Sequence, residues 1–222
     1  MKERGMIFNS EMVRAILDGR KTQTRRLVKG TDGAVKFCKE WDINGEEIFV
    51  VLGEKDHTGM NPVLGAISCP FGAVGDRIWV REAFRVHSRA TDVATLVYKA
   101  SERNSWTEQT HRVPVAVCNK PATPEKWTPS LHMPRWASRI LLEIIDVRVE
   151  RLNAISQEDA QAEGMELTGW RPTYSDPDSG GEVWTPYDNF AQLWESIYGE
   201  ESWKANPWVW VIEFKRIEGG AA

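Results

Sequence analysis

Runs of alternating or β-branched residues constrain the fold of this chain more than any other feature of its sequence. In residues 77–86 (RIWVREAFRV), the apolar side chains of Ile78, Val80, Phe84 and Val86 recur at every second position, as in a half-buried strand. Further strands are expected from their composition at 94–99, 113–117, 138–149 and 208–217. Several antiparallel strands with few helices predict an α+β protein, a small mixed β-barrel decorated with helices.

Three helices and two insertions complete this prediction. Helices are expected at residues 10–18, 156–163 and 188–198. Segment 30–68 is Gly-rich and polar with one short apolar run, and segment 166–187 holds three prolines and a Gly-Gly pair. Both segments are interpreted as long insertions rather than separate domains. Residues 1–222 are therefore expected to form a single domain.

Composition and charge exclude several classes of protein. The formal net charge is −4, so any nucleic-acid contact must come from a local basic patch on an acidic surface. The three cysteines and four histidines are too scattered for a disulfide framework or a metal site, and no cofactor is expected. No membrane-spanning run and no signal peptide are expected, which favours a cytoplasmic protein without a membrane partner. The eleven tryptophans indicate an aromatic core or a surface that stacks on flat ligands.

A basic motif follows the first predicted helix. Residues 19–26 (GRKTQTRR) begin with a glycine, which is free to take a positive φ at a helix end. Five cationic side chains gather around this helix end: Arg14, Arg20, Lys21, Arg25 and Arg26. Taken alone, the motif is better explained by a solvated basic turn, because short motifs are weakly specific.

The motif resembles the GxKxxExR signature of the ASCH domain, a member of the PUA-like β-barrel superfamily. Gly19, Lys21 and Arg26 match the signature, whereas Thr24 stands at the position of its glutamate. The segment GRKTQTRR is also similar to the corresponding segment of the small bacterial N(4)-acetylcytidine amidohydrolases. Those proteins carry lysine and threonine at the same two positions.

Further matches follow in the same order along the chain. They are Gly75-Asp76 before a strand, Ala162-Glu163-x-Met165 at a helix end, and VIEFK at 211–215. The segments GDRIWVREAF and SLHMPRWASRI resemble larger ASCH-like proteins that are common in bacteriophages and prophages. The similarity covers most of the chain in pieces, the two insertions are unmatched, and the collinear order of the motifs is the stronger signal.

The resemblance to the amidohydrolases implies a catalytic set of Lys21, Thr24 and Glu163. Cleaving an amide on an exocyclic amine requires a nucleophile, a base and an oxyanion donor, and Thr24 can supply the nucleophilic hydroxyl. Lys21, if neutral, could remove the hydroxyl proton, and the neighbouring arginines would lower its pKa. Glu163, at the negative end of a short helix, is an alternative proton acceptor, so the assignment of the base stays open.

This catalytic set carries geometric expectations. An extended segment would point Lys21 and Thr24 to opposite faces, so a shared site requires a turn or helical winding between them. Lys21 and Glu163 are expected to approach each other. Both are expected at a cleft that solvent can reach rather than in the core.

Other residues are candidates for substrate binding. Glu82 lies on the core-facing side of its strand, where it is either a structural partner for an arginine or a pocket residue. Segment 126–139 interleaves cations with flat rings in a proline-stiffened loop, which suits a base or backbone contact. Its tryptophans can equally plug one end of a barrel. The full set of substrate-binding candidates is Arg26, Trp79, Glu82, Arg135, Trp136 and Arg139.

The sequence therefore predicts an amidohydrolase that removes an acyl group from the exocyclic amine of a modified cytidine or a related nucleobase. The alternative is an RNA-binding PUA-like module or a ribonuclease, and a phage accessory protein with a structural role is a third interpretation. The expected partner is a modified nucleoside or a short RNA. Neither the acyl group nor the oligomeric state follows from the sequence.

Overall fold

The computed structural model describes residues 1–165 and 185–217. Most of the insertion predicted at 166–187 therefore lies outside the described residues. The chain divides into two compact units, and both contain strands and helices, so the fold is mixed α+β. Unit 1 comprises residues 1–19, 74–145 and the chain from residue 214, and unit 2 comprises residues 20–73 and 146–213.

Unit 1 contains strands of two sheets. Its strands are β1 (Glu3–Ile7), β6 (Arg77–Arg81), β7 (Phe84–Arg89), β8 (Val93–Tyr98), β9 (Thr110–Pro114) and the first part of β10 (Leu141–Arg151). In one sheet β1 pairs in parallel with β6, and β6 pairs antiparallel with β10. In the other sheet β7, β8 and β9 follow one another as antiparallel neighbours. The helices of this unit are α1 (Ser10–Leu17) and α2 (Trp106–Gln109), with 3-10 turns at Lys99–Ser101, Ser130–His132 and Arg135–Ala137.

Local sequence signals explain the first helix and the core of unit 1. The Asn9 side chain caps α1 by accepting a hydrogen bond from the backbone N of Met12 at 2.8 Å. Gly19 follows the helix with a φ of +75°, which is the left-handed conformation expected at this position. The core beneath the β7–β8–β9 sheet consists of Phe84, Val86, Ala94, Leu96, Tyr98, Val113, Cys118, Met133 and Ala137.

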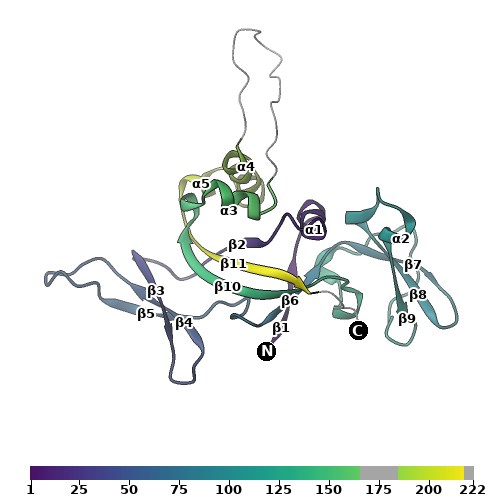
Figure 1. The fold of residues 1–222 in the computed structure, drawn as a ribbon, viewed down its shortest axis with the longest axis horizontal. Helices are drawn as coiled ribbons and strands as arrows, with labels where there is room; N and C mark the ends of the chain where they lie inside the picture. The colour runs from purple at the N-terminus through teal and green to yellow at the C-terminus, as the bar shows by residue number, and fades with distance from the viewer. Residues whose placement is uncertain (166–184, 218–222) are drawn as a thin grey trace, which may run out of the picture. The chain divides into compact units, whose positions relative to one another are not determined.

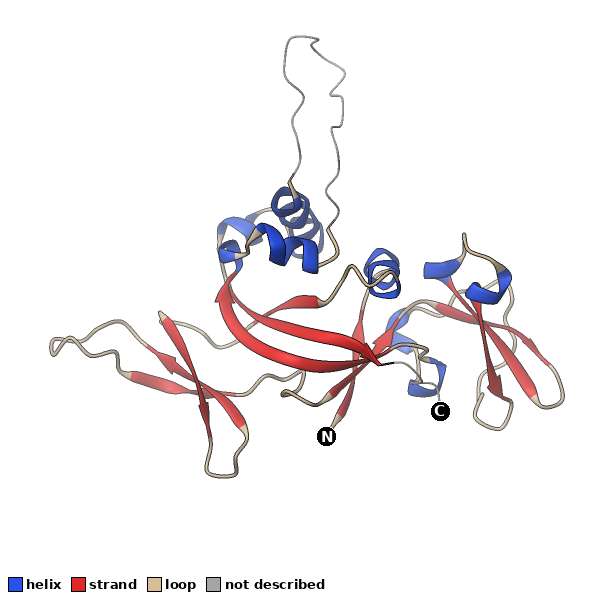
Figure 2. Cartoon of the chain, viewed as in Figure 1, coloured by secondary structure: helices blue, strands red, loops and turns tan. Residues whose placement is uncertain are grey.

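Unit 2 combines a strand pair, a small sheet and a group of helices. Its elements are β2 (Gln23–Leu27), β3 (Lys36–Trp41), β4 (Glu47–Leu52), β5 (Val63–Ile67), α3 (Gln157–Ala162), α4 (Pro186–Tyr198), α5 (Glu201–Lys204) and the first part of β11 (Trp208–Ile217). β2 pairs antiparallel with β11, while β3, β4 and β5 form an antiparallel sheet of their own (Figure 2). Figure 1 shows α3, α4 and α5 grouped together, and apolar residues of α3 and α4 pack against Val209 and Val211 of β11.

The structure corrects three details of the predicted elements. Segment 77–86 is not one strand, because the ladder breaks at Glu82 and Ala83, and the Ala83 carbonyl accepts a hydrogen bond from Lys99 N at 3.0 Å. The strand expected at 113–117 lies three residues earlier, at β9. The insertion at 30–68 carries the ordered sheet β3–β4–β5 rather than an irregular loop.

The strands of the described residues form three sheets, each with a linear strand order, so the expected barrel is not closed in this part of the chain. The three predicted helices are present as α1, α3 and α4, and the shorter α2 and α5 were not predicted. Across residues 1–165 and 185–217, no helix combines the length and hydropathy that a membrane span requires.

Candidate active site

The segment before β2 runs alongside the C-terminal end of α3 in unit 2. Thr22 N donates a hydrogen bond to the Ala162 carbonyl at 2.8 Å, and Lys21 pairs with Glu163 in an isolated antiparallel bridge. Gly164 has a φ of +94°, which lets the chain leave the helix directly after Glu163. These backbone bonds hold together two motifs that are 142 residues apart in the sequence.

The side chains of Lys21 and Glu163 form a buried ion pair. Lys21 Nζ lies 2.6 Å from Glu163 Oε2 and also donates to the Glu163 backbone carbonyl at 2.9 Å. The other carboxylate oxygen, Oε1, accepts a hydrogen bond from Arg25 Nη1 at 3.2 Å. The Glu163 carboxylate therefore lies between two cations, which is the arrangement that a buried charge requires.

Burial dominates the electrostatics of Lys21. Removal from water lowers the pKa of its ammonium group below the ordinary lysine value, and the charges of Arg26 and Arg25 lower it further. The charge and hydrogen bond of Glu163 act in the opposite direction but do not cancel the effect of burial. The expected lowering is therefore present, although desolvation contributes more than the neighbouring arginines.

Thr24 lies in β2, three residues after Lys21, and has a different hydrogen-bond partner. Its Oγ1 accepts a hydrogen bond from Arg26 Nη1 at 2.8 Å, and the same nitrogen donates to the Arg25 carbonyl at 2.9 Å. The chain is extended from residue 23, without the turn or helical winding that a direct contact between Lys21 and Thr24 requires. The structure thus contains two separate pairs, Lys21 with Glu163 and Thr24 with Arg26, and the turn expected for a shared Lys21–Thr24 site is not present.

A second layer of charges fixes Arg25 behind the ion pair. Arg25 Nη2 donates to Asp159 Oδ2 at 2.9 Å, and Arg148 Nη2 donates to the same oxygen at 3.2 Å. Burial alone would raise the pKa of Asp159, but Gln23, Arg25 and Arg148 outweigh it and hold that pKa below its usual value. Asp159 is therefore an ionised anchor for both arginines, a role that its position in a short polar helix did not reveal.

The expectation of a solvent-reachable cleft at these residues is wrong. Lys21, Thr24 and Glu163 are only 2 %, 0 % and 3 % exposed. The physical reason is the backbone pairing of residues 21–22 with the end of α3, which encloses the ion pair, and the ladder partner Ile212, which is itself buried beside Thr24. A substrate therefore reaches these groups only if part of the surrounding structure moves.

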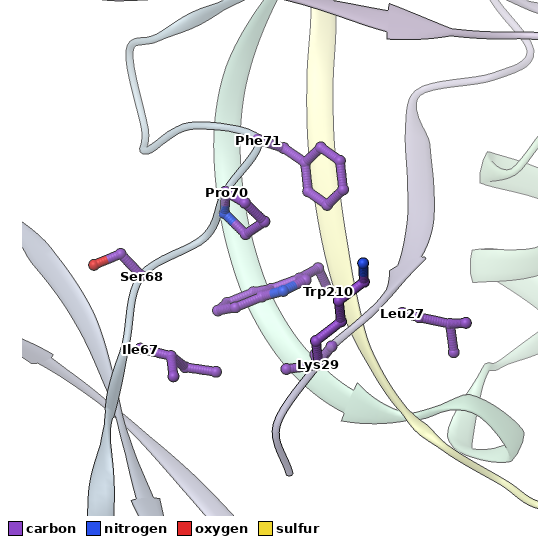
Figure 3. A pocket seen from close by; sticks show the side chains of 8 residues that line it. Leu27, Lys29, Ile67, Ser68, Pro70, Phe71 and Trp210 are labelled. Carbon is purple, nitrogen blue, oxygen red and sulfur yellow. The ribbon is translucent and has the colours of Figure 1, made fainter.

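Unit 2 also contains an open cavity of about 440 Å³, which lies within the size range of ligand pockets. Figure 3 shows the rings of Phe71, Pro70 and Trp210 around it, with Ser68 and Lys29 among the lining residues. The remaining lining residues are Leu27, Val28 and Ile67. Sequence reasoning missed this cavity, although the tryptophans of segment 208–217 and the Pro70-Phe71 pair were visible in the sequence.

In unit 1, two of the substrate-binding candidates bind each other. Arg139 Nε and Nη2 donate to Glu82 Oε1 and Oε2 at 2.9 and 3.1 Å, a bidentate pair. The guanidinium of Arg139 also lies 4.0 Å from the centre of the Tyr98 ring and donates to Ser101 Oγ. Burial raises the pKa of Glu82, and Arg139 opposes this shift. Of the two roles considered for Glu82, the structural partnership with an arginine fits this geometry.

The other unit 1 candidates also have internal partners. The Trp79 ring lies 5.3 Å from the Arg81 guanidinium, and Arg135 Nε donates to Glu3 Oε2 at 2.9 Å. Trp136 packs edge-to-face on Phe84 at 6.3 Å against the unit 1 core. Trp136 is therefore a packing residue in this structure. Arg26, in unit 2, contacts Thr24 of the catalytic set.

Sequence reasoning also missed two contacts with tryptophan rings along β7, one from an arginine and one from a histidine. The Arg85 guanidinium lies 4.5 Å from the Trp127 ring centre, and His87 packs on Trp106 with ring centres 5.0 Å apart. Arg85 and His87 alternate with core residues along the strand, which places them together on its outer face. That alternation was the sequence signal that could have identified them.

Comparison of the chain with protein-family models, with curated proteins and with solved structures gives no significant match. Within the described residues, no group of three or more His, Cys, Asp or Glu side chains is arranged to hold a metal ion.

Proposed function

We propose that this protein is an amidohydrolase that removes an acyl group from the exocyclic amine of a modified cytidine, and that its α+β fold is a PUA-like variant. The observation that carries the proposal is the buried Lys21–Glu163 pair next to the hydrogen-bonded Thr24 and Arg26. A lysine with a lowered pKa, a hydroxyl and a fixed guanidinium are the groups that nucleophilic amide cleavage requires.

In the proposed reaction, Thr24 Oγ attacks the carbonyl carbon of the amide while its proton passes to neutral Lys21. Arg26, which already donates to Thr24 Oγ1, stabilises the negative charge that develops on the carbonyl oxygen. The carbon–nitrogen bond then breaks, and Lys21 returns its proton to the departing exocyclic amine. Water hydrolyses the acyl-threonine and releases the acyl group as a carboxylate.

The lowered pKa favours Lys21 over Glu163 as the base, and Glu163 then orients Lys21 and balances its charge once it is protonated. In the structure Lys21 Nζ contacts Glu163 rather than Thr24, so proton transfer requires Lys21 to turn toward Thr24 or a water to connect them.

Incubating the purified protein with N(4)-acetylcytidine and separating the products by chromatography tests the proposal. Release of cytidine supports it, and an unchanged substrate contradicts it.

The rate of this reaction should rise with pH, because the base must be neutral. Lys21 is protonated below its own pKa, and burial lowers that pKa from the ordinary value of 10.5. We therefore expect kcat/KM to rise through an acid limb and to level off at a pH below 10.5. Initial rates of cytidine release across this range provide the measurement. A limb centred at the ordinary lysine value, or a fall in rate across the same range, would contradict Lys21 as the base.

RNA binding is a second candidate function, and the contacts of Arg85 and His87 with tryptophan rings on β7 favour it. Segment 84–127 carries seven lysines and arginines against four aspartates and glutamates, whereas the whole chain has a net charge of −4. Trp106 is 52 % exposed, so one of the rings is available for stacking on a base.

Salt dependence separates the two functions. A nucleoside carries no phosphate, so deacylation should change little with salt, whereas RNA affinity should fall steeply because bound phosphates release counterions. We expect weak binding of a short single-stranded RNA, lost between about 50 and 200 mM salt and reduced further by Arg85→Ala. Fluorescence anisotropy of a labelled RNA measures both effects. Tight RNA binding by a protein that deacylates no cytidine amide would favour the binding module instead.

A further inference from the structure

The cavity of unit 2 has the chemistry of a site for a flat ring. Phe71, Pro70 and Trp210 lie around it (Figure 3), and Trp210 is only 2 % exposed. Trp210 is anchored by an edge-to-face contact with Phe49, with ring centres 5.0 Å apart. Lys29 and Ser68 are the polar residues of the lining, and the Ser68 hydroxyl points away from the rings. A cavity that is mostly apolar, with aromatic walls and few polar groups, is typical of sites for planar heterocycles.

The strand register places one lining residue of this cavity on the strand pair that carries Thr24 and Arg26. Trp210 is the ladder partner of Arg26, and Ile212 is the partner of Thr24. Paired residues of an antiparallel ladder point to the same face, and so do residues two apart along a strand. Thr24, Arg26 and Trp210 therefore share one face of the β2–β11 pair, and Thr24 lies two residues, about 7 Å, along β2 from the position opposite Trp210.

Arg26 connects the two regions. Its backbone pairs with Trp210, which forms a wall of the cavity, while its guanidinium reaches Thr24 Oγ1 at 2.8 Å. Arg26 and Thr24 do not line the cavity and Thr24 is fully buried, so the exocyclic substituent of a ring bound against Phe71 reaches them only if the surrounding structure moves. The insertion at 30–68 contributes here, since Ile67 and Ser68 at its end line the cavity and Pro70 and Phe71 follow directly.

We propose that this cavity binds the heterocyclic base of the nucleoside substrate, with the ring against Phe71 and the polar groups of the base or sugar near Lys29. This assignment rests on the proposed amidohydrolase function for the orientation of the base. Binding of the base itself depends only on the cavity, so it is measured independently of turnover.

Titration calorimetry of the full chain with cytidine tests the site. Phe71→Ala removes one aromatic wall and should raise the Kd for cytidine roughly tenfold or more. Phe37→Ala is the matched control, because Phe37 is a half-buried ring of the same unit that packs on Trp208 and does not line the cavity. Its Kd should stay within about twofold of the parent. Ile67→Trp enlarges a lining side chain that points toward the rings (Figure 3) and should abolish binding even if Phe71→Ala fails to fold.

The outcomes distinguish failure of the proposed binding site from failure of the proposed reaction. Loss of cytidine binding in the Phe71 and Ile67 variants supports the site. If the parent binds cytidine but cleaves no acylated cytidine, the site stands and only the proposed function is contradicted. If the enzyme is active, Phe71→Ala should raise KM for acetylcytidine with little change in kcat. No cytidine binding by the parent, or equal binding by the parent and both cavity variants, overturns the site.

Discussion

Thr24→Val is expected to reduce cytidine release from acetylcytidine by at least about a thousandfold, because it removes the hydroxyl that forms the acyl intermediate. Valine has nearly the shape of threonine, but it removes the acceptor of the hydrogen bond from Arg26 Nη1, so circular dichroism must first show that the variant is folded. Lys21→Met and Glu163→Gln should lower kcat by comparable factors, because they remove the base and the group that orients it. Time courses of product formation by chromatography measure all three losses.

The chain offers a matched control two residues away. Thr22 is exposed, and its backbone N rather than its side chain makes the bond to α3, so Thr22→Val should keep turnover within about twofold. Near-normal turnover in Thr24→Val would rule out the threonine as nucleophile and leave attack by water or by Lys21. Trapping of an acyl group on Thr24, detected by mass spectrometry, distinguishes these routes directly.

The elements that could be predicted from the sequence are those whose pattern is local. Segment 208–217 is a strand over its whole predicted length, because its β-branched and aromatic residues favour an extended chain. Helix α1 begins at its capping residue and is followed by Gly19 with a positive φ. These signals act within a few residues, so no knowledge of the tertiary contacts was needed to recognise them.

Elements defined by long-range contacts could not be predicted in this way. β2 has the polar sequence QTRRL, and its Gln23 and Arg25 can be buried because α3 and its C-terminal end supply Asp159 and Glu163 as partners. The same contacts enclose the ion pair that the sequence placed at an open cleft. Only the resemblance to known motifs linked Lys21 to Glu163, since nothing in the local pattern of either segment indicates the other.

The break at Glu82 shows a second limit of pattern reading. The alternating pattern in the sequence continues through residues 77–86. The carboxylate at position 82 requires a cation once it is buried, and Arg139 supplies it. The strand therefore ends at Arg81, and β7 begins at Phe84 and pairs with β8 in another sheet. A polar residue on an apolar face was the signal, and its partner could be identified only from the structure.

Arg139→Met should destabilise the protein by about 3–5 kcal/mol, because it leaves the Glu82 carboxylate buried without a counter-charge. Glu82 is 2 % exposed and receives two hydrogen bonds from this one guanidinium, so solvent cannot replace the lost partner. Urea unfolding followed by circular dichroism measures the loss. A loss below about 1 kcal/mol would show that the pair is not a structural element and would return Glu82 and Arg139 to the substrate-binding candidates.

The double variant and the pH dependence provide the control for this interpretation. Combining Glu82→Gln with Arg139→Met removes the unpaired charge, so it should recover a substantial part of the lost stability. Burial already raises the pKa of Glu82, and loss of Arg139 removes the charge that opposes this shift, so the folded single variant should bind a proton more readily than its unfolded chain. Its stability relative to the parent should therefore improve as the pH falls from neutral toward the folded-state pKa of Glu82 and below it. If the difference in unfolding free energy between parent and variant stays constant over this pH range, the variant has lost packing against Tyr98 rather than a charge partner.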